Sequence, residues 1–287
     1  MKLGGRQIDL STPVVMGILN VTPDSFSDGS LLADQSAGSG FRVSVDKALH
    51  LARTMVVEGA AIIDVGGEST RPGAHPVGLQ EELDRVIPVI ERITAELDVA
   101  VSVDTSSPQV MRAAARAGAS MINDIRALQR EGALETVAES GLAACLMHMQ
   151  GEPGTMQQLC DYDDVVADVL AFLAQRVAAA IGAGIPRDRL LVDPGFGFGK
   201  TLTQNYELLS SLERFGDLGL PVLVGISRKS MIGKVVDRPV DQRLAGSIAA
   251  ATMALERGAV ILRSHDVAAT VDAIRVHCAL KNTKQGR

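Results

Sequence analysis

Aromatic residues are scarce in this chain. Only 3% of its 287 residues are Phe, Trp or Tyr, and Trp is absent. The core must therefore be built from Val, Ile, Leu, Ala and Met, and a hydrophobic share of 46% allows this. A chain of this length can bury a substantial core, so we expect neither a metal nor a disulfide to be needed for stability.

Cysteines are few and show no spacing typical of a metal site. None of Cys145, Cys160 and Cys278 belongs to a CxxC pair, a pattern that favours reduced thiols in a cytoplasmic protein. The first residues contain no apolar segment typical of a signal peptide. No uninterrupted apolar run approaches the roughly 18 residues of a membrane span. We therefore expect a cytoplasmic protein that does not bind a membrane.

The chain also lacks a block of charge. Its formal net charge is -6, and its Lys and Arg residues are scattered rather than clustered. This distribution argues against nucleic acid or an anionic membrane surface as the main partner. An anionic substrate would have to be bound by a few local cations.

Several catalytic motifs are absent. The five histidines form no HxH or HExxH pair, which argues against a metal-dependent hydrolase. No GxSxG motif is present, because Ser227 is followed by Arg228 and Lys229. Residues 195–201 read GFGFGKT, but Pro194 stands where the first glycine of a phosphate-binding GxxxxGK[ST] loop is required. We interpret this segment as a loop that presents a flat aromatic wall.

Short apolar runs alternate with stretches of helical periodicity. Runs of this kind are typical of parallel strands that are buried on both faces. The expected strands are residues 14–21, 60–66, 99–104, 120–124, 143–149, 190–194, 221–227 and 259–266. Eight strand–helix units predict a (β/α)8 barrel, a TIM barrel, that forms a single domain over residues 1–287. A doubly wound open sheet is the alternative.

Every predicted strand ends in a polar side chain. The ends carry Asn20, Asp64, Asp104, Asn123 with Asp124, His148, Asp193, Ser227 with Arg228 and Lys229, and Arg263 with His265. A single Asp after a strand is often only the N-cap of the next helix. A barrel, however, directs all its strand ends toward one site. The long segments 22–40 and 66–78 follow the first two strands, and we expect them to be loops that cover this site.

The polar ends differ in chemistry. Two carboxylates (Asp104 and Asp193), the amide of Asn123 and the ammonium of Lys229 suit an amino-substituted heterocycle, although they could also simply satisfy one another. The expected phosphate-binding residues are Arg71, Arg263 and His265, of which the last two lie on one face of a strand. His265 could instead only begin a helix. Asn20 could offer an oxygen ligand to Mg²⁺.

These residues lie in motifs that closely resemble the dihydropteroate synthase family of folate biosynthesis. The resemblance covers residues 15–265. The motifs are MGILNVTPDSFSDG at 16–29, DVGGESTRPG at 64–73, SVDT at 102–105, INDI at 122–125, DPGFGFGK at 193–200, GISRKS at 225–230 and RSHD at 263–266. The departures are few: Ser30 replaces a common glycine, the stretch after it is long, and Ser264 is expected to face away from the site.

The resemblance implies a transferase that joins p-aminobenzoate to 6-hydroxymethyl-7,8-dihydropterin diphosphate and releases diphosphate, with Mg²⁺ as cofactor. The residues implied to hold the pterin are Asp104, Asn123, Asp193 and Lys229. Those implied to hold diphosphate and Mg²⁺ are Arg71, Arg263, His265 and the metal ligand Asn20. Those implied to frame the aminobenzoate are Thr70, Pro72, Phe198, Ser230 and Phe26. The implied catalytic residues are Asp104, Lys229, Arg263 and His265.

Two other functions remain to be distinguished. A pterin-binding methyltransferase shares the acid-and-amide pocket but does not need the diphosphate residues, and a catalytically silent paralogue would bind without turnover. The sequence also leaves Asp64 and His148 without a firm role, beyond possible support of other side chains. We expect a homodimer, with residues 247–255 and 268–279 as its candidate surface. Ordinary packing of these helices on the barrel would explain the same pattern.

Overall fold

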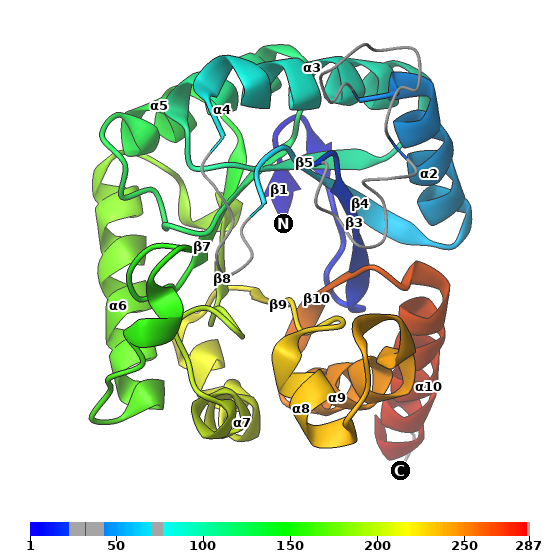
Figure 1. Ribbon diagram of the computed structural model, residues 1–287, viewed down its shortest axis with the longest axis vertical. Helices are drawn as coiled ribbons and strands as arrows, with labels where there is room; N and C mark the ends of the chain where they lie inside the picture. Colours follow the sequence, from blue (N-terminus) through cyan, green and yellow to red (C-terminus); the bar gives the residue numbers. More distant parts are fainter. Residues whose placement is uncertain (23–31, 33–42, 70–76, 286–287) are drawn as a thin grey trace.

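A computed structural model describes residues 1–22, 32, 43–69 and 77–285, and eight parallel strands in it form a closed barrel (Figure 1). The strands are β3 (Val14–Asn20), β4 (Ala60–Gly66), β5 (Ala100–Asp104), β6 (Met121–Asp124), β7 (Ala143–Met147), β8 (Leu190–Asp193), β9 (Val222–Val224) and β10 (Ala259–Ser264). The last strand pairs with the first, with Arg263 beside Met16. The predicted barrel is therefore confirmed, and the open-sheet alternative is wrong.

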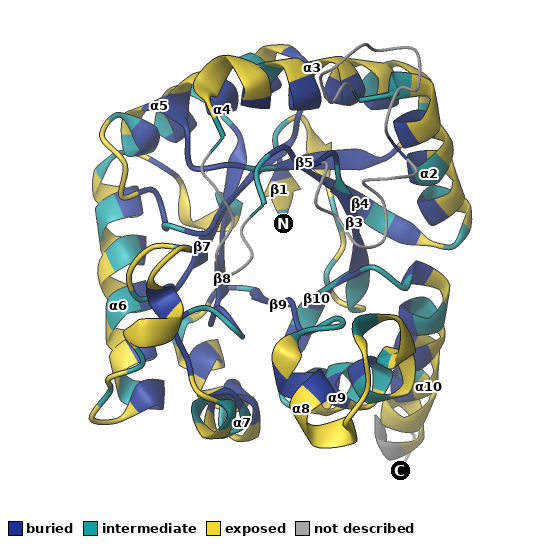
Figure 2. Ribbon diagram, in the orientation of Figure 1, coloured by how far each residue is buried: buried dark blue, intermediate teal, exposed yellow. Residues whose placement is uncertain are grey.

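Helices surround the strands. They are α2 (Val45–Val57), α3 (Leu79–Glu96), α4 (Pro108–Arg116), α5 (Ala133–Ser140), α6 (Val165–Gly182), α7 (Leu202–Ser210), α8 (Ser230–Val236), α9 (Leu244–Glu256) and α10 (Val267–Gln285). Figure 2 shows buried faces turned toward the strands and exposed faces turned outward. Local signals begin some of them: the Asp164 side chain accepts hydrogen bonds from two backbone N–H groups of α6, and Thr201 forms a capping box with Gln204 on α7.

Helix α6 is the most apolar of the long helices, although Asp168, Gln175 and Arg176 interrupt its apolar residues. Its 18 residues have a mean hydropathy of 1.7, long and apolar enough by composition to cross a membrane. A third of this helix is buried inside the protein, and its Arg176 donates hydrogen bonds to Ala127 O at 2.8 Å and Leu128 O at 3.0 Å. The helix therefore packs as one of the outer helices of the barrel.

A short hairpin that the sequence did not predict closes the amino-terminal end of the barrel. Strands β1 (Lys2–Leu3) and β2 (Arg6–Gln7) pair antiparallel, and Figure 1 shows them within the ring of strands. Leu3 is 1% exposed and packs into the apolar cluster of the barrel interior. The other buried members of that cluster are Met16, Ile62, Ala100, Met121, Ala143, Cys145, Leu191, Leu223 and Ile261.

The two-residue period of a strand explains how the same strands reach the site. On β3, Met16 belongs to the interior apolar cluster, while Ile18 and Asn20 line the cavity at the other end. On β10, Ile261 belongs to the cluster and Arg263 lines the cavity. These two strands therefore place Met16 and Ile261 at the amino-terminal end of the interior and the polar Asn20 and Arg263 at the carboxyl-terminal end.

Candidate active site

A cavity of about 590 Å³ opens at the carboxyl-terminal ends of the strands. Nine residues predicted from the sequence line it together: Asn20, Asp104, Asn123, Asp193, Phe198, Lys229, Ser230, Arg263 and His265. They come from β3, β5, β6, β8 and β10 and from the segments that follow β8, β9 and β10. The remaining predicted residues, Phe26, Thr70, Arg71 and Pro72, lie outside the described residues, as do most of the expected covering loops.

Arg263 joins two acidic strand ends. Its Nε lies 2.6 Å from Asp64 Oδ2 and its Nη2 lies 3.0 Å from Asp104 Oδ2. Asn123 donates from Nδ2 to the same oxygen of Asp64 at 3.0 Å. Asp64 is fully buried, so its carboxyl group requires hydrogen-bond donors. Asp64, whose role the sequence left open, contacts both the guanidinium of Arg263 and the amide of Asn123.

Burial shifts the pKa values of this cluster. It raises the pKa of Asp104 from 3.8 to about 7, and Arg263 opposes this rise while Asp64 adds to it. Burial alone would lower the pKa of Arg263, but the two carboxylates outweigh it and raise that pKa. Burial is the main cause of the raised Asp104 pKa, and the carboxylate of Asp64 adds to it, since the two acids share one guanidinium. A positive charge placed in the cavity beside Asp104 would be stabilised.

Asp193 and Lys229 form the second charged group. Burial raises the pKa of Asp193, against the attraction of Lys229. Burial likewise lowers the pKa of Lys229 to about 8, against the attraction of Asp193. The Asp193 carboxylate accepts a hydrogen bond from Gly195 N at 2.7 Å, and Lys229 donates to Phe196 O. Both groups are thus held in place without a substrate.

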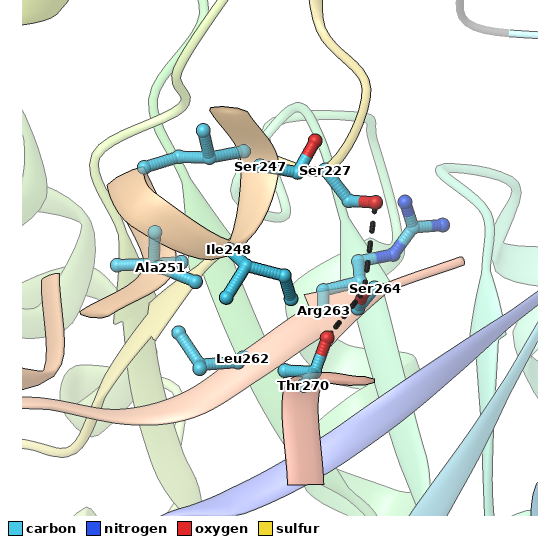
Figure 3. A pocket seen from close by; sticks show the side chains of 10 residues that line it. Ser227, Ser247, Ile248, Ala251, Leu262, Arg263, Ser264 and Thr270 are labelled. Atoms are coloured by element: carbon cyan, nitrogen blue, oxygen red, sulfur yellow. Dashed lines mark hydrogen bonds between the residues drawn. The ribbon is translucent and has the colours of Figure 1, made fainter. Parts of the chain in front are cut away.

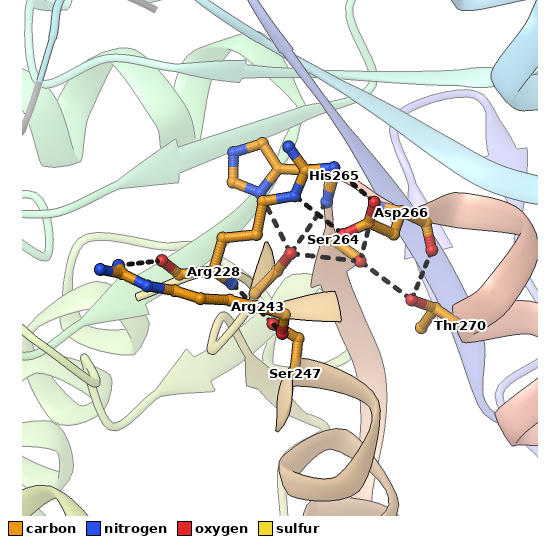
Figure 4. A network of polar contacts seen from close by, with 8 residues as sticks. Arg228, Arg243, Ser247, Ser264, His265, Asp266 and Thr270 are labelled. Atoms are coloured by element: carbon orange, nitrogen blue, oxygen red, sulfur yellow. Dashed lines mark hydrogen bonds and ion pairs between the residues drawn. The ribbon is translucent and has the colours of Figure 1, made fainter. Parts of the chain in front are cut away.

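A basic rim lies beside these groups, on the side of β9 and β10 (Figure 4). Ser227 Oγ lies 3.1 Å from His265 Nδ1 and accepts a hydrogen bond from His265 N at 3.2 Å. Arg228 has a left-handed backbone, with φ of 57°, and its Nε lies 2.9 Å from Asp266 Oδ2. Arg243 donates to Arg228 O at 3.0 Å. Cation-rich surroundings of this kind suit a phosphate group.

The sequence reasoning missed Arg243. It precedes α9 rather than following a strand, so the pattern of polar strand ends could not identify it. It reaches the cavity because the loop before α9 folds back over the end of β9. Its hydrogen bonds to Arg228 O and, at 3.0 Å, to Arg238 O connect that loop with the rim.

A second pocket, of only about 10 Å³, lies between β10 and α9 (Figure 3). Ser264 lines it and does not line the large cavity, in keeping with its position between Arg263 and His265. Thr270 donates a hydrogen bond to Ser264 Oγ at 2.9 Å. Ser264 therefore belongs to the packing behind the site, and the departure from the family motif leaves the cavity lining unchanged.

His148 does not line the cavity. Its Nδ1 lies 3.0 Å from the Nζ of Lys200, and its ring packs against Phe172 with centroids 4.9 Å apart. Burial, together with the nearby charge of Lys200, lowers the pKa of His148 to about 3. The ring is therefore neutral and supports the wall of the cavity from behind.

Comparisons with known proteins agree with this geometry. The family model described as "Pterin binding enzyme" matches residues 16–265. The dihydropteroate synthase of Haemophilus influenzae is 54% identical over 284 residues, which cover 98% of this chain and 100% of that protein. The dihydropteroate synthase of Escherichia coli K12 is 52% identical over 283 residues, with coverage of 99% and 97%.

Solved structures are similar over almost the whole chain. A Yersinia pestis dihydropteroate synthase in a sulfonamide drug complex has a TM-score of 0.92 and 49% identity, covering 98% of this chain and 99% of that one. A Xanthomonas albilineans dihydropteroate synthase with 4-aminobenzoic acid has a TM-score of 0.88 and 51% identity, with 97% of each chain covered. The same species provides a complex with 7,8-dihydropteroate, with a TM-score of 0.84, 48% identity and 97% of each chain covered.

Proposed function

The chain belongs to the dihydropteroate synthase family, and we propose that its cavity divides the work of that reaction among three groups of residues. The reaction joins p-aminobenzoate to 6-hydroxymethyl-7,8-dihydropterin diphosphate and releases diphosphate. One group holds the pterin, a second holds the diphosphate, and a third frames the arylamine. The observation that supports this division is that one cavity is lined both by an acid-and-amide floor, Asp104, Asn123 and Asp193, and by a basic rim, Arg228, Arg243 and His265.

The floor suits the pterin. Asp104, Asn123 and Asp193 offer a carboxylate, an amide and a second carboxylate, which match alternating donors and acceptors on a heterocycle. Because Asp64 takes an N–H of Asn123, the orientation of that amide is set before substrate binds. Lys229 adds a donor that is already held beside Asp193.

The rim suits the leaving group. Arg263, which is also bound to Asp64 and Asp104 of the floor, and His265 would bind the diphosphate, together with Arg71 from outside the described residues. Arg243 lines the same cavity and would assist. In the bond-breaking step the carbon–oxygen bond between the pterin methylene and diphosphate breaks, and its electron pair leaves with the diphosphate. The positive charge that develops on the pterin methylene would be stabilised by Asp104, a buried carboxylate that shares the guanidinium of Arg263 with Asp64.

The arylamine then completes the exchange. Its nitrogen forms the new bond to the methylene carbon and loses a proton, so no covalent enzyme intermediate is needed. Phe198 and Ser230 line the cavity near Lys229 and would frame the ring of p-aminobenzoate, with Phe26, Thr70 and Pro72 of the covering loops. Exclusion of water by those loops would protect the cationic methylene from hydrolysis.

The residues present fit Mg²⁺. The described residues contain no cluster of three or more His, Cys, Asp or Glu that could hold a metal, but Mg²⁺ commonly combines one or two protein oxygens with substrate phosphates and water. Asn20 would supply such an oxygen: a Cβ on Gly66 would lie 3.3 Å from Asn20 Oδ1, so the glycine leaves space beside that oxygen. The ion would neutralise charge on the leaving diphosphate.

The proposed function is tested by diphosphate release. The purified chain is mixed with dihydropterin diphosphate, p-aminobenzoate and Mg²⁺, and each substrate is omitted in turn. Stoichiometric formation of diphosphate and dihydropteroate is expected only with both substrates. Tight pterin binding without release would identify a silent paralogue. Transfer of a methyl group to or from a pterin, without diphosphate release, would identify a methyltransferase.

We further propose a cytoplasmic homodimer formed through α9 and α10. Met253 on α9 and Val276 on α10 are 49% and 70% exposed, and Leu280 extends the same helix surface with 50%. Exposed apolar side chains on neighbouring helices favour association. Light scattering should give the mass of two chains, and Val276→Glu should reduce it to that of one. A single-chain mass for the unmodified protein would disprove the dimer.

A further inference from the structure

Lys200 is a buried basic residue with no role in the binding groups described above. It is 3% exposed, and its Nζ donates hydrogen bonds to Gly195 O at 2.9 Å and Phe198 O at 3.0 Å. Its third close contact is His148 Nδ1, at 3.0 Å. All three acceptors are uncharged, and burial lowers the pKa of Lys200 to about 7. Since burying a basic group among neutral acceptors is costly, its position calls for a specific reason.

Two of these acceptors, the carbonyls of Gly195 and Phe198, belong to one loop, residues 195–199, which we call the Phe198 loop. Three of its residues, Gly195, Gly197 and Gly199, have left-handed backbones with φ of 72°, 81° and 62°. A Cβ on Gly195 would lie 1.8 Å from His148 O, so the loop is pressed against the segment that follows β7. In this path the carbonyls of Gly195 and Phe198 point toward Lys200, behind the cavity, and Lys200 donates to both, while Gly195 O also accepts a hydrogen bond from Phe198 N at 3.2 Å.

Other side chains anchor single points of the Phe198 loop. Asn205 Oδ1 accepts a hydrogen bond from Gly197 N at 2.6 Å, and the Tyr162 hydroxyl donates to Gly199 O at 2.8 Å. Lys200 differs from Asn205 and Tyr162 because it donates hydrogen bonds to the loop at two places, Gly195 O and Phe198 O. The same ammonium group also contacts His148 Nδ1. It therefore fixes the curvature of the loop rather than one peptide group.

The opposite side of the Phe198 loop faces the cavity. Phe198 lines the cavity, and Lys229 Nζ lies 4.6 Å from the centroid of its ring. Lys229 also donates to Phe196 O. The loop is thus held between two lysines, with Lys229 on the cavity side and Lys200 on the buried side. A shift of the loop would move the Phe198 ring more than it would move Asp193. The backbone of Asp193 lies on β8, which is paired with β7 at Met147.

We propose that Lys200 is a positioning residue that sets the place of Phe198 and thereby the binding of the arylamine. The inference rests on the proposed role of Phe198 in framing p-aminobenzoate. Lys200 touches neither substrate and acts only through the backbone of the Phe198 loop. His148 is part of the same device, because its neutral ring accepts a hydrogen bond from Lys200 and fixes the direction of the ammonium group.

The test is steady-state kinetics on Lys200→Met, which keeps the length and apolar stem of the side chain and removes its donors. The KM for p-aminobenzoate should rise about tenfold, since displacements of about 1 Å have large effects on substrate positioning. The KM for dihydropterin diphosphate should stay within about twofold, because the floor residues remain anchored by their strands. A general loss of folded protein would lower apparent turnover and leave both KM values unchanged.

Arg176→Met is the matched control. Arg176 also donates to two backbone carbonyls of a loop, those of Ala127 and Leu128, but it does not contact the Phe198 loop. Its replacement should lower stability and change neither KM. If both variants raised the KM for p-aminobenzoate equally, the effect would be general and the inference wrong.

A second pair of variants applies if Lys200→Met does not fold. His148→Leu removes the acceptor for Lys200, while His148→Asn can keep an oxygen near the position of Nδ1. The inference predicts a selective rise in the KM for p-aminobenzoate in His148→Leu and a smaller one in His148→Asn. Equal values in these two variants and the unmodified enzyme would overturn it.

Phe198→Ala separates this inference from the proposed function. If Phe198→Ala raises the KM for p-aminobenzoate but Lys200→Met and His148→Leu do not, the arylamine region is correct and the inference about Lys200 is wrong. If Phe198→Ala itself leaves that KM unchanged, the proposed arylamine region is wrong, and the inference fails with it.

Discussion

The two ends of the barrel interior are made by the same strands but by opposite chemistry. The amino-terminal end is filled by an apolar cluster that includes Leu3 of the hairpin, and each buried member is at most 3% exposed. The carboxyl-terminal end holds Asp64, Asp104 and Asp193 with Arg263 and Lys229, around a cavity of about 590 Å³. One end excludes water completely, while the other admits substrates.

The contrast shows how stability and function are separated within one fold. Burial of apolar side chains at the closed end stabilises the barrel. Burial of charge at the open end opposes stability, as the rise in the pKa of Asp104 from 3.8 to about 7 indicates. Substitutions at the open end should therefore lower turnover, whereas substitutions at the closed end should lower the free energy of unfolding.

The largest effect is expected for Asp104→Asn at the open end. Turnover should fall roughly 10²- to 10³-fold, because a charge that stabilises the cationic methylene is lost. The KM for dihydropterin diphosphate should change less than about threefold, since an amide can still form hydrogen bonds to the ring. Initial rates of diphosphate release measure both quantities. Asp272→Asn, an exposed carboxylate on α10, is the control, and equal losses in turnover and pterin affinity would contradict the charge-stabilising role.

A smaller effect, on stability rather than on turnover, is expected for Leu3→Ala at the closed end. Truncation of a fully buried leucine should lower the free energy of unfolding by about 3 kcal/mol. Turnover and both KM values should remain unchanged under conditions where the protein is folded. Urea denaturation measures the free energy of unfolding, and steady-state kinetics measures turnover and the two KM values. Val57→Ala, at an 84% exposed position, should affect neither, and a loss of turnover in folded Leu3→Ala would show that the two ends are coupled.

A third effect concerns pH. The Asp104 carboxyl has a higher pKa in the folded state, about 7, than its usual 3.8. Its contribution to stability is therefore fully present below about pH 4 and is lost as the pH rises through about 7. Between pH 5 and pH 8 the free energy of unfolding should fall by at least about 1 kcal/mol more in the unmodified protein than in Asp104→Asn. The free energy of unfolding of both proteins is measured by urea denaturation across this pH range. If it changed equally with pH in the two proteins, Asp104 would be ionised in the folded state throughout the range, and the prediction would be wrong.

The smallest effect is expected for Lys2→Ala in the hairpin. Lys2 Nζ lies 3.0 Å from Asp188 Oδ2, but the two side chains are 67% and 51% exposed. An exposed ion pair of this kind should contribute less than about 0.5 kcal/mol to the free energy of unfolding. The hairpin is thus held by Leu3, one residue away, rather than by its charge. A loss comparable with that of Leu3→Ala would reverse this assignment.

Much of the barrel could be predicted because its signals are local. Each strand is a short apolar run, and the expected boundaries differ from the observed ones by a few residues, as for β7, which ends at Met147 rather than at residue 149. The hairpin could not be predicted, because strands of two residues have no periodicity. Its position depends on the space left by large and small side chains, such as Met16 and Ala100, at the end of the barrel.

The amino-acid sequence by itself determined which residues stand at the strand ends, because the two-residue period of a strand and the order of the units are written along the chain. Only the tertiary structure decided which of them are partners. Arg263 pairs with Asp64 across 199 positions of sequence, and Lys200 meets His148 across 52, distances at which no local pattern carries information. Closure of the barrel brings these groups together, and burial then converts their proximity into the shifted pKa values of the site.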